Sequence, residues 1–291
     1  MSDEQVIVAQ TNRNGNKPAP TPGEQPLAVA GTGLVSILIP CCGQLEYTKL
    51  CLPALLRHTR IPFELLFLDI GSLDGTADYL AGIAAALPNL RVEVLRAASD
   101  LDIPSACSDA LAAARGECLV LLNNDTIVTE GWLHQLLALA ALSTAVGLVG
   151  PMSNYAAPPQ LVETVPYRVG PRRHVQPRGG AQWLVEVEAV HAFAKQYRQE
   201  HKGKWAAAER LGGFCLLVKR EVLQRIGPLE SDLGLGLFDT DVLSMKARVA
   251  GFTLAVCCDV FVHHFGTRTF AHGSANPPPP VPDRRNSTTA N

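Results

Sequence analysis

The chain has 291 residues, of which 47% are hydrophobic and 18% charged, enough for one large α/β domain or two small ones. Its formal net charge of −2 gives no electrostatic reason to expect nucleic acid or an anionic membrane surface as a partner. No apolar run is long enough to span a bilayer, and the polar N-terminal residues predict neither a secretory signal nor a transit peptide.

Strands and helices are predicted to alternate through the first half of the chain. The apolar runs predict strands at 34–40, 63–69, 90–96, 118–122 and 145–149, and helical spacing predicts helices at 44–58, 76–87, 104–115 and 130–142. Such alternation predicts a doubly wound, largely parallel sheet with right-handed crossovers. The eight cysteines lack the spacing of a zinc site, so we expect reduced, buried thiols in a cytoplasmic protein.

The alternation stops after residue 150. Pro, Gly and Arg predict a long loop at 151–180, before an amphipathic helix at 184–201. The last predicted elements are a strand at 212–218, a short helix ended by Gly227 and Pro228, a helix at 238–250 and strands at 252–258 and 260–263. Residues 1–33 and 273–291 have the composition of disordered tails.

Polar residues follow the buried strand at 118–122, beginning with Asn123, Asn124 and Asp125. Open α/β sheets bind ligands just past the carboxyl ends of their strands. A carboxylate with an amide two residues before it suits a hard cation and the phosphate oxygens that the cation carries. The same residues also favour turns, so a simple turn before the next helix remains an alternative.

Asp69 ends the second predicted strand, much as Asp125 follows the fourth. We expect the two carboxylates to point into one crevice, where one holds a metal and the other accepts a hydrogen bond from a nucleobase or ribose. Gly71 and Gly75 permit a tight turn there. A helix-capping role is the alternative, which we favour for Asp74 but not for Asp69.

Asp239 and Asp241 stand at the start of a predicted helix, where the helix dipole alone favours acidic residues. The functional alternative is a general base that deprotonates a hydroxyl nucleophile. His263 and His264 end a predicted strand, so their imidazoles turn to opposite faces. One of them is therefore a candidate metal ligand and the other a packed or solvated ring.

The chain from about Leu34 to Phe270 resembles the inverting glycosyltransferases of family 2, which have the GT-A fold and use nucleotide-sugar donors. Six segments carry the resemblance in the family's order. They are similar to its first strand, nucleobase motif, Arg-Gly and Asp-x-Asp motifs, acceptor-side segment, base segment and C-terminal histidine segment, at 35–40, 69–76, 113–126, 212–215, 238–241 and 263–266.

The resemblance implies an α/β, Rossmann-like, mostly parallel sheet flanked by helices, in a single domain at 34–272. A nucleotide-binding half would occupy 34–150 and an acceptor-binding half 151–272. The implied nucleotide-sugar contacts are Pro40, Asp69, Ser72, Asn123, Asn124 and Asp125, and the implied ligands of Mn²⁺ or Mg²⁺ are Asp125 with His263 or His264. The implied base is Asp239 or Asp241, and the implied acceptor side is formed by Ser153, Asn154, Tyr155, Gly213 and Phe214.

The function implied is metal-dependent, inverting transfer of a sugar to the hydroxyl of a saccharide, lipid-linked or protein acceptor, in polysaccharide or glycoconjugate synthesis. A UDP- or dTDP-sugar is favoured over a GDP-sugar as the donor. The expected location is the cytoplasm, with peripheral attachment to the inner membrane face as a variant.

Departures from the family motifs keep a second reading open, that of a catalytically impaired glycosyltransferase-like binding or scaffold protein. Asn123 replaces the first Asp of Asp-x-Asp, Asp100 and Asp102 add negative charge to a donor-side loop, and Thr240 takes a usual Asp position. A dinucleotide-dependent oxidoreductase is disfavoured, because the glycines at 31–33 precede the first strand instead of following it.

Overall fold

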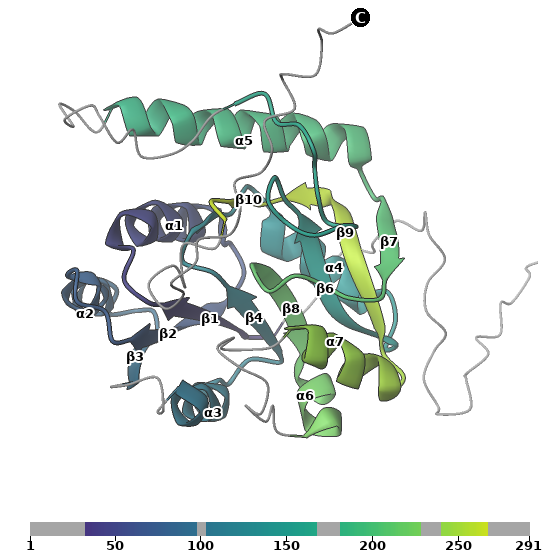
Figure 1. Cartoon of the computed structure of the whole chain (residues 1–291), viewed down its shortest axis with the longest axis horizontal. Helices are drawn as coiled ribbons and strands as arrows, with labels where there is room; N and C mark the ends of the chain where they lie inside the picture. The colour runs from purple at the N-terminus through teal and green to yellow at the C-terminus, as the bar shows by residue number, and fades with distance from the viewer. Residues whose placement is uncertain (1–32, 98–102, 168–180, 228–239, 267–291) are drawn as a thin grey trace, which may run out of the picture.

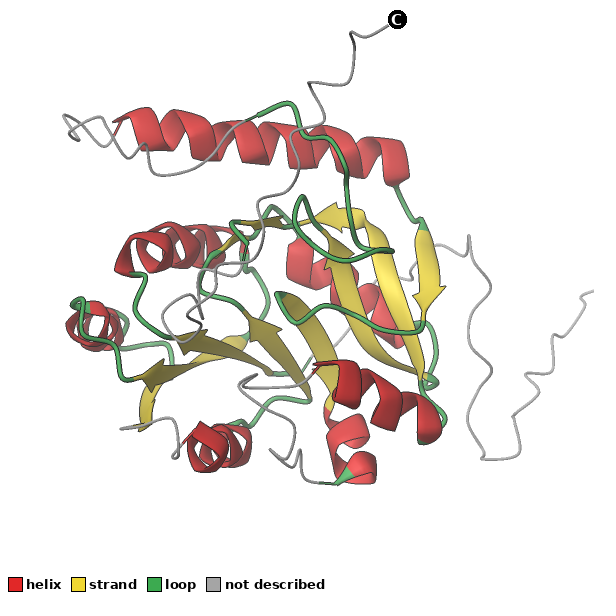
Figure 2. Cartoon of the chain, in the orientation of Figure 1, coloured by secondary structure: helices red, strands yellow, loops and turns green. Residues whose placement is uncertain are grey.

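The computed structural model describes residues 33–97, 103–167, 181–227 and 240–266. Within them a central sheet is covered by helices on both faces (Figure 1; Figure 2). The strands are β1 (Val35–Cys41), β2 (Phe63–Ile70), β3 (Val92–Ala97), β4 (Cys118–Leu122), β5 (Thr126–Ile127), β6 (Val146–Met152), β7 (Trp205–Ala208), β8 (Cys215–Lys219), β9 (Thr253–Phe261) and β10 (His263–His264). The helices are α1 (Leu45–His58), α2 (Thr76–Ala86), α3 (Ile103–Ala113), α4 (Trp132–Ala141), α5 (Ala181–His201), α6 (Arg220–Ile226) and α7 (Thr240–Val249).

The main sheet has eight strands in the order β3-β2-β1-β4-β8-β6-β9-β7. Six of them run in one direction, whereas β8 and β7 run in the other. The predicted largely parallel sheet is therefore confirmed. The carboxyl ends of β1, β2, β4, β6 and β9 consequently meet at one edge of the sheet.

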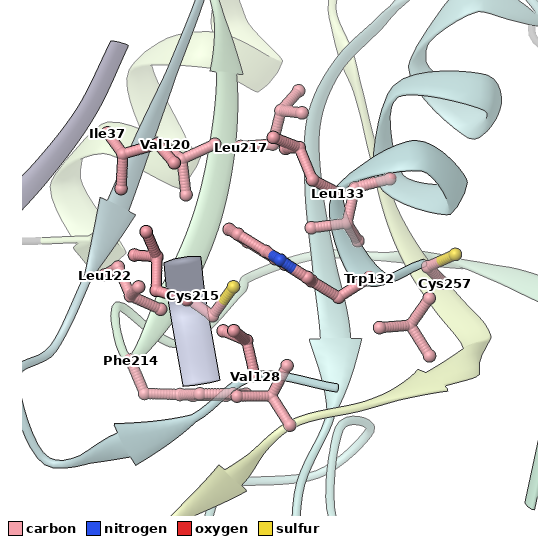
Figure 3. Close-up of a cluster of buried hydrophobic side chains, with 14 of the residues drawn as sticks. Ile37, Val120, Leu122, Val128, Trp132, Leu133, Phe214, Cys215, Leu217 and Cys257 are labelled. Atoms are coloured by element: carbon pink, nitrogen blue, oxygen red, sulfur yellow. The ribbon is translucent and has the colours of Figure 1, made fainter. Parts of the chain in front are cut away.

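Alternate side chains of each strand feed two separate cores. Ile37 and Ile39 of β1 point into the core covered by α1, α2, α4 and α5, while Leu38 points into the core covered by α3, α6 and α7. This alternation explains the largely apolar runs, since strands buried on both faces need apolar residues at most positions. In the first core, Trp132 lies among side chains from β1, β4 and β8 (Figure 3), and its Nε1 donates to Thr59 Oγ1 at 3.2 Å.

The strands and helices of the first half lie where the sequence predicts them, within a few residues. The second half differs in detail. Residues 252–263, predicted as two strands, form the single strand β9 followed by the two-residue β10, and the strand predicted at 212–218 begins only at Cys215. Strands β5 and β7 were not predicted. The run at 205–208 is rich in alanine, which favours helix, but pairing with β9 outweighs that preference.

Among the described residues, no helix is both long and apolar enough to cross a membrane. None of the eight cysteines forms a disulfide, and all are buried or half-buried, as expected. The tails expected at 1–33 and 273–291 lie outside the described residues, apart from Gly33.

Candidate active site

The edge where the parallel strands end carries most of the predicted site residues. Asp69 is the second-to-last residue of β2. Asp125 follows β4, Asn154 follows β6, and His264 follows β9. Strand β1 separates β2 from β4, so Asp69 and Asp125 lie two strand spacings apart, about 10 Å across the sheet. Both carboxylates thus lie at the same edge of the sheet, and the single crevice expected for them stays a prediction.

A buried carboxylate and a buried imidazole face each other at this edge. Nε2 of His264 lies 3.4 Å from Oδ1 of Asp125, and neither side chain is more than 7% exposed. The contact depends on the small antiparallel sheet of β5 and β10, in which His264 pairs with Thr126 and the N–H of Phe265 donates to the Asp125 carbonyl at 3.0 Å. Two distant parts of the chain are thus held in register at the site.

The other nitrogen of the His264 ring faces a backbone carbonyl. Nδ1 lies 2.9 Å from the carbonyl oxygen of Tyr155, which can only accept, so Nδ1 carries the proton. Nε2 of the same ring then faces Asp125, with Asn123 Nδ2 at 3.5 Å. Phe214 stacks on the ring at 5.3 Å between centroids. An imidazole nitrogen and a carboxylate oxygen that face each other are a donor set that suits a divalent cation.

His263 occupies the opposite face of β10, as the alternation predicts. Its Nδ1 lies 3.1 Å from the hydroxyl of Tyr167, and its ring packs edge-on against Phe265. Burial, followed by the neighbouring His264, lowers the pKa of His263 to about 3. Of the two candidate ligands, the structure therefore brings His264 to Asp125. Within the described segments, no group of three or more His, Cys, Asp or Glu side chains is arranged to hold a metal ion.

The two asparagines before Asp125 have different environments. Asn124 is fully buried, and its Nδ2 donates to the Gly43 carbonyl at 3.2 Å and to Thr48 Oγ1 at 2.9 Å. It therefore ties the loop after β4 to the start of α1. Asn123 is half-buried and has its side chain beside His264. Of the two predicted nucleotide contacts, Asn123 is the one beside the candidate ligands.

Asp69 is 3% exposed and has a partner at each oxygen. Oδ1 accepts from the Ser72 N–H at 3.3 Å, and Oδ2 lies 3.3 Å from Nε of Arg96 at the end of β3. Arg96 was missed in the sequence, although a position at the end of a neighbouring parallel strand would have pointed to it. Pro40, also predicted to contact the donor, is buried near the end of β1.

The loop between Asp69 and α2 is fastened to the loop before α1. Ser72 Oγ accepts from the Gly43 N–H at 2.8 Å. Asp74 accepts from the backbone N–H groups of Leu45 and Thr76, the first residues of α1 and α2, at 2.9 and 3.2 Å. Although burial acts in the opposite direction, hydrogen bonds from Thr76 and Leu45 hold the pKa of the Asp74 carboxyl below its usual value. Asp74 thus satisfies the first N–H of both helices, as a structural role predicts, although the N-cap position of α2 itself is Gly75.

The residues predicted for the acceptor side surround His264. Asn154 bonds to the backbone of His264, and Ser153 is fully buried, with its Oγ accepting from the Tyr155 N–H at 3.3 Å. Phe214 stacks on the ring, as described above. Gln160 was not predicted; it is buried and accepts from the Gly212 N–H at 2.7 Å while donating to the Pro151 carbonyl at 2.9 Å. No sequence signal distinguishes Gln160 from a surface glutamine in a loop.

Helix α7, which carries a candidate base, begins next to this group. A Cβ on Gly213 would lie 2.9 Å from Cγ2 of Thr240, so the helix start packs directly on the segment before β8. Asp241 is exposed in the first turn of α7, 3.8 Å from Arg210. Asp239, the other candidate base, and the acidic pair Asp100 and Asp102 lie outside the described residues.

The Arg-Gly segment at 115–117 lies at the opposite edge of the sheet, before β4. The Gly116 N–H donates to Ser36 Oγ at 2.8 Å, and a Cβ on Gly116 would lie 2.4 Å from the Ser36 nitrogen. The Arg115 N–H donates to the buried Glu64 at 2.6 Å. This motif therefore has a packing role here.

Comparison with known proteins gives consistent results. Residues 32–274 match the model of a family described as "Glycosyltransferase like family 2". Over 232 residues the chain is 31% identical to the uncharacterized protein y4gI of Sinorhizobium fredii, covering 76% of this chain and 23% of that protein. Over 233 residues it is 25% identical to glycosyltransferase AglE of Haloferax volcanii, and the match covers 79% of this chain and 66% of AglE. The chain thus spans about a quarter of the first relative and just under two thirds of the second.

Solved structures resemble the fold at low sequence identity. The mannosyltransferase PcManGT of Pyrobaculum calidifontis, in complex with GDP-Man and Mn²⁺, aligns with a TM-score of 0.56 and 20% identity, covering 80% of this chain and 57% of that one. GalNAc-T7 with UDP, GalNAc and Mn²⁺ aligns with a TM-score of 0.58 and 16% identity, and the alignment covers 86% of this chain and 46% of GalNAc-T7. S. aureus TarS 1–349 aligns with a TM-score of 0.51 and 16% identity, covering 79% and 60%.

Proposed function

The chain belongs to the glycosyltransferase-like family 2 and has the GT-A fold, and from this premise we propose that it is a metal-dependent glycosyltransferase. It would move a sugar from a nucleotide-diphosphate sugar to an acceptor hydroxyl. The observation that carries the proposal is the buried pair of Asp125 and His264, whose facing atoms lie 3.4 Å apart at the edge where the parallel strands end.

In this proposal Asp125 and His264 hold a divalent ion, Mn²⁺ or Mg²⁺, with the amide of Asn123 beside them. Oxygen and imidazole ligands suit Mn²⁺, so Asp125 and His264 would fit such an ion. Such an ion, when bound, neutralises the charge that develops on the diphosphate leaving group. The Mn²⁺ in the structures of PcManGT and GalNAc-T7 supports this assignment by analogy of fold.

Asp69 is proposed to contact the nucleobase. Its carboxylate keeps acceptor capacity beyond its bonds to Ser72 and Arg96, because two ionised oxygens offer about four acceptor sites. An N–H group of uracil or thymine would be the donor to it, which favours a UDP- or dTDP-sugar. Nε of Arg96 lies 3.3 Å from Oδ2 and holds the carboxylate from the side of β3.

The base is proposed to come from the start of α7, as Asp239 or Asp241. The packing of Thr240 on Gly213, next to the Phe214 that stacks on His264, supports a carboxylate from this segment near the donor. It would take the proton of the acceptor hydroxyl while that oxygen displaces the nucleoside diphosphate with inversion. We further propose an acceptor in polysaccharide or glycoconjugate synthesis and action on the cytoplasmic side.

Calorimetry of UDP binding with and without Mn²⁺ tests the metal assignment. We expect Mn²⁺ to tighten UDP binding to the wild-type chain and to have little effect on the Asp125→Ala or His264→Ala variants. If Mn²⁺ tightened UDP binding equally in the wild type and in both variants, the metal assignment would be contradicted. Sugar transfer from UDP-sugars then separates an enzyme from an impaired binding protein, because the latter would bind donor without releasing UDP.

A further inference from the structure

We propose that Asn154 is a positioning residue that fixes the His264 imidazole with Nε2 aimed at Asp125, an inference that rests on the function proposed above. Asn154 grips the backbone of His264 at two points. Its Nδ2 donates to the His264 carbonyl at 3.0 Å, and its Oδ1 accepts from the His264 N–H at 3.0 Å. The side-chain amide thus acts like the peptide group of a neighbouring strand.

The two bonds from Asn154 satisfy backbone groups of β10 on the side that faces away from β5. In the pairing of β10 with β5, the N–H of Phe265 bonds to the Asp125 carbonyl. The N–H and carbonyl of His264 bond to Asn154 instead, so they do not take part in that pairing. Because a two-residue strand has few hydrogen bonds, the two from Asn154 form a large part of what holds His264 in register.

The next residue of the same loop orients the ring itself. The Tyr155 carbonyl accepts from Nδ1 of His264 at 2.9 Å, and its ring packs edge-on against the imidazole. Gly266, at a φ of +81°, passes so close to the Tyr155 ring that a Cβ would lie 3.0 Å away. Residues 154 and 155 therefore contact His264 at its N–H, its carbonyl and its Nδ1, which leaves Nε2 for Asp125.

The loop that carries Asn154 is closed by its own hydrogen bonds. The Ser153 N–H donates to the Gln160 carbonyl, and the Val162 N–H donates to the Ser153 carbonyl, each at 2.8 Å. Gln160 also bonds to Gly212, in the segment that leads to Phe214. The loop and Phe214 are therefore linked on the two sides of the ring. Groups that orient metal-binding histidines typically contribute about 10- to 100-fold to metal affinity.

Two variants and a matched control test the proposal. Asn154→Ala removes both bonds to His264, whereas Asn154→Asp keeps the size and the acceptor but places a carboxylate oxygen against the His264 carbonyl. Ser36→Ala is the control: like the Asn154 change it removes two side-chain hydrogen bonds, here from the buried Ser36 to Glu64 and Gly116, but at the opposite edge of the sheet. Thermal unfolding of all three checks that they are folded and comparably destabilised.

Two readouts separate positioning from a general structural role. ¹⁵N NMR of histidine-labelled protein without metal, with His264→Ala for assignment, should show the Nδ1–H form of His264 in the wild type and the control, and mixed tautomers in the Asn154 variants. Calorimetry with UDP should show Mn²⁺ affinity about 10- to 100-fold lower in the Asn154 variants and unchanged in Ser36→Ala.

An unchanged tautomer together with wild-type Mn²⁺ affinity in a folded Asn154 variant would overturn the proposal. A loss of Mn²⁺ affinity equal to that of Ser36→Ala would also overturn it, since the loss would then follow stability alone. If the wild-type chain itself bound no Mn²⁺, the proposed function would fail, and the tautomer result would decide on Asn154 by itself. In that case the positioning role of Asn154 is supported if its variants show mixed His264 tautomers and contradicted if they do not.

Discussion

Gly213 and Thr240 touch so closely that a single added methyl group would separate the segment before β8 from the start of α7: a Cβ on Gly213 would lie 2.9 Å from Cγ2 of Thr240. The next residue after Gly213 stacks on His264. The contact therefore fixes the distance between the candidate metal ligand and the helix that carries Asp241.

If the base comes from the start of α7 as proposed, we expect Gly213→Ala to lower the turnover of sugar transfer by up to about 100-fold, because a shift of about 1 Å there would misplace it. UDP binding with Mn²⁺ should change little. The matched control is Gly82→Ala in α2, where a Cβ meets nothing within 4 Å. That variant should keep full turnover and gain about 0.5–1 kcal/mol of stability. Equal turnover in the two variants would show that the contact does not position the base.

The adjacent asparagines Asn123 and Asn124 should give opposite results. Asn124→Ala leaves Thr48 and the Gly43 carbonyl without their buried donor, so we expect a loss of about 1–3 kcal/mol in the free energy of unfolding. Asn123→Ala should cost little stability and weaken Mn²⁺-dependent UDP binding, since its side chain lies beside His264. Urea unfolding and calorimetry on both variants check this, and a stability loss larger for Asn123 would be inconsistent with it.

A histidine pair between α1 and α5 should make the protein sensitive to acid. The rings of His58 and His191 lie 4.5 Å apart between centroids, and His58 Nε2 and His191 Nδ1 are buried without hydrogen-bond partners. Burial, followed by His191, lowers the pKa of His58 from 6.5 to about 4, and burial likewise lowers the pKa of His191. Arg57, Arg60, Glu130 and Glu188 are the charged groups that also act on the pair.

Both rings stay neutral in the folded state at pH values where the unfolded chain already binds protons. The contribution of this pair to the free energy of unfolding is therefore fully present above pH 6.5 and is lost as the pH falls toward 4. Allowing for the partial exposure of the rings, we expect a loss of about 1–2 kcal/mol. Urea midpoints across this range should fall less steeply in a His58→Gln, His191→Gln double variant. The same slope in both proteins would assign the acid sensitivity to other groups.

Gly116→Ala should destabilise the fold without changing the site. The added Cβ would lie within 2.8 Å of backbone atoms of Leu34, Ser36 and Cys118. Ser36 and Cys118 are held in the pairing of β1 with β4, and the Leu34 carbonyl accepts from the Glu117 N–H, so these atoms cannot move aside as a side chain can. We expect a loss of about 1–3 kcal/mol in thermal unfolding. Mn²⁺-dependent UDP binding of the folded fraction should equal that of the wild type. A selective loss of binding would instead give the Arg-Gly segment a role in donor recognition.

The first half of the fold is predictable because its strands are buried on both faces, which leaves continuous apolar runs such as 65–68 and 118–122 in the sequence. Short strands leave no such pattern. β5 and β10 have two residues each and exist only because they pair with each other. For the same reason, alternation alone predicts that His263 and His264 face opposite sides, but only the register against β5 decides that His264 meets Asp125.

The roles of Asn154 and Gln160 were equally beyond sequence reasoning. Each is a polar residue in a loop of unremarkable composition, and its function depends on which backbone groups the folded chain brings to it. Asp69 and Asp125 were easier to identify because the direction of parallel strands fixes where their ends lie, whatever the loops do.

The position of β10 also sets an order of events during synthesis. Asp125 leaves the ribosome well before His264, so the large sheet up to β9 can be made in full while the ligand pair does not yet exist. A chain that stops at Phe261 would keep every strand of that sheet and lack the imidazole. Under the proposed metal assignment, such a chain would lack one of the two ligands, so metal binding would require the residues that follow β9.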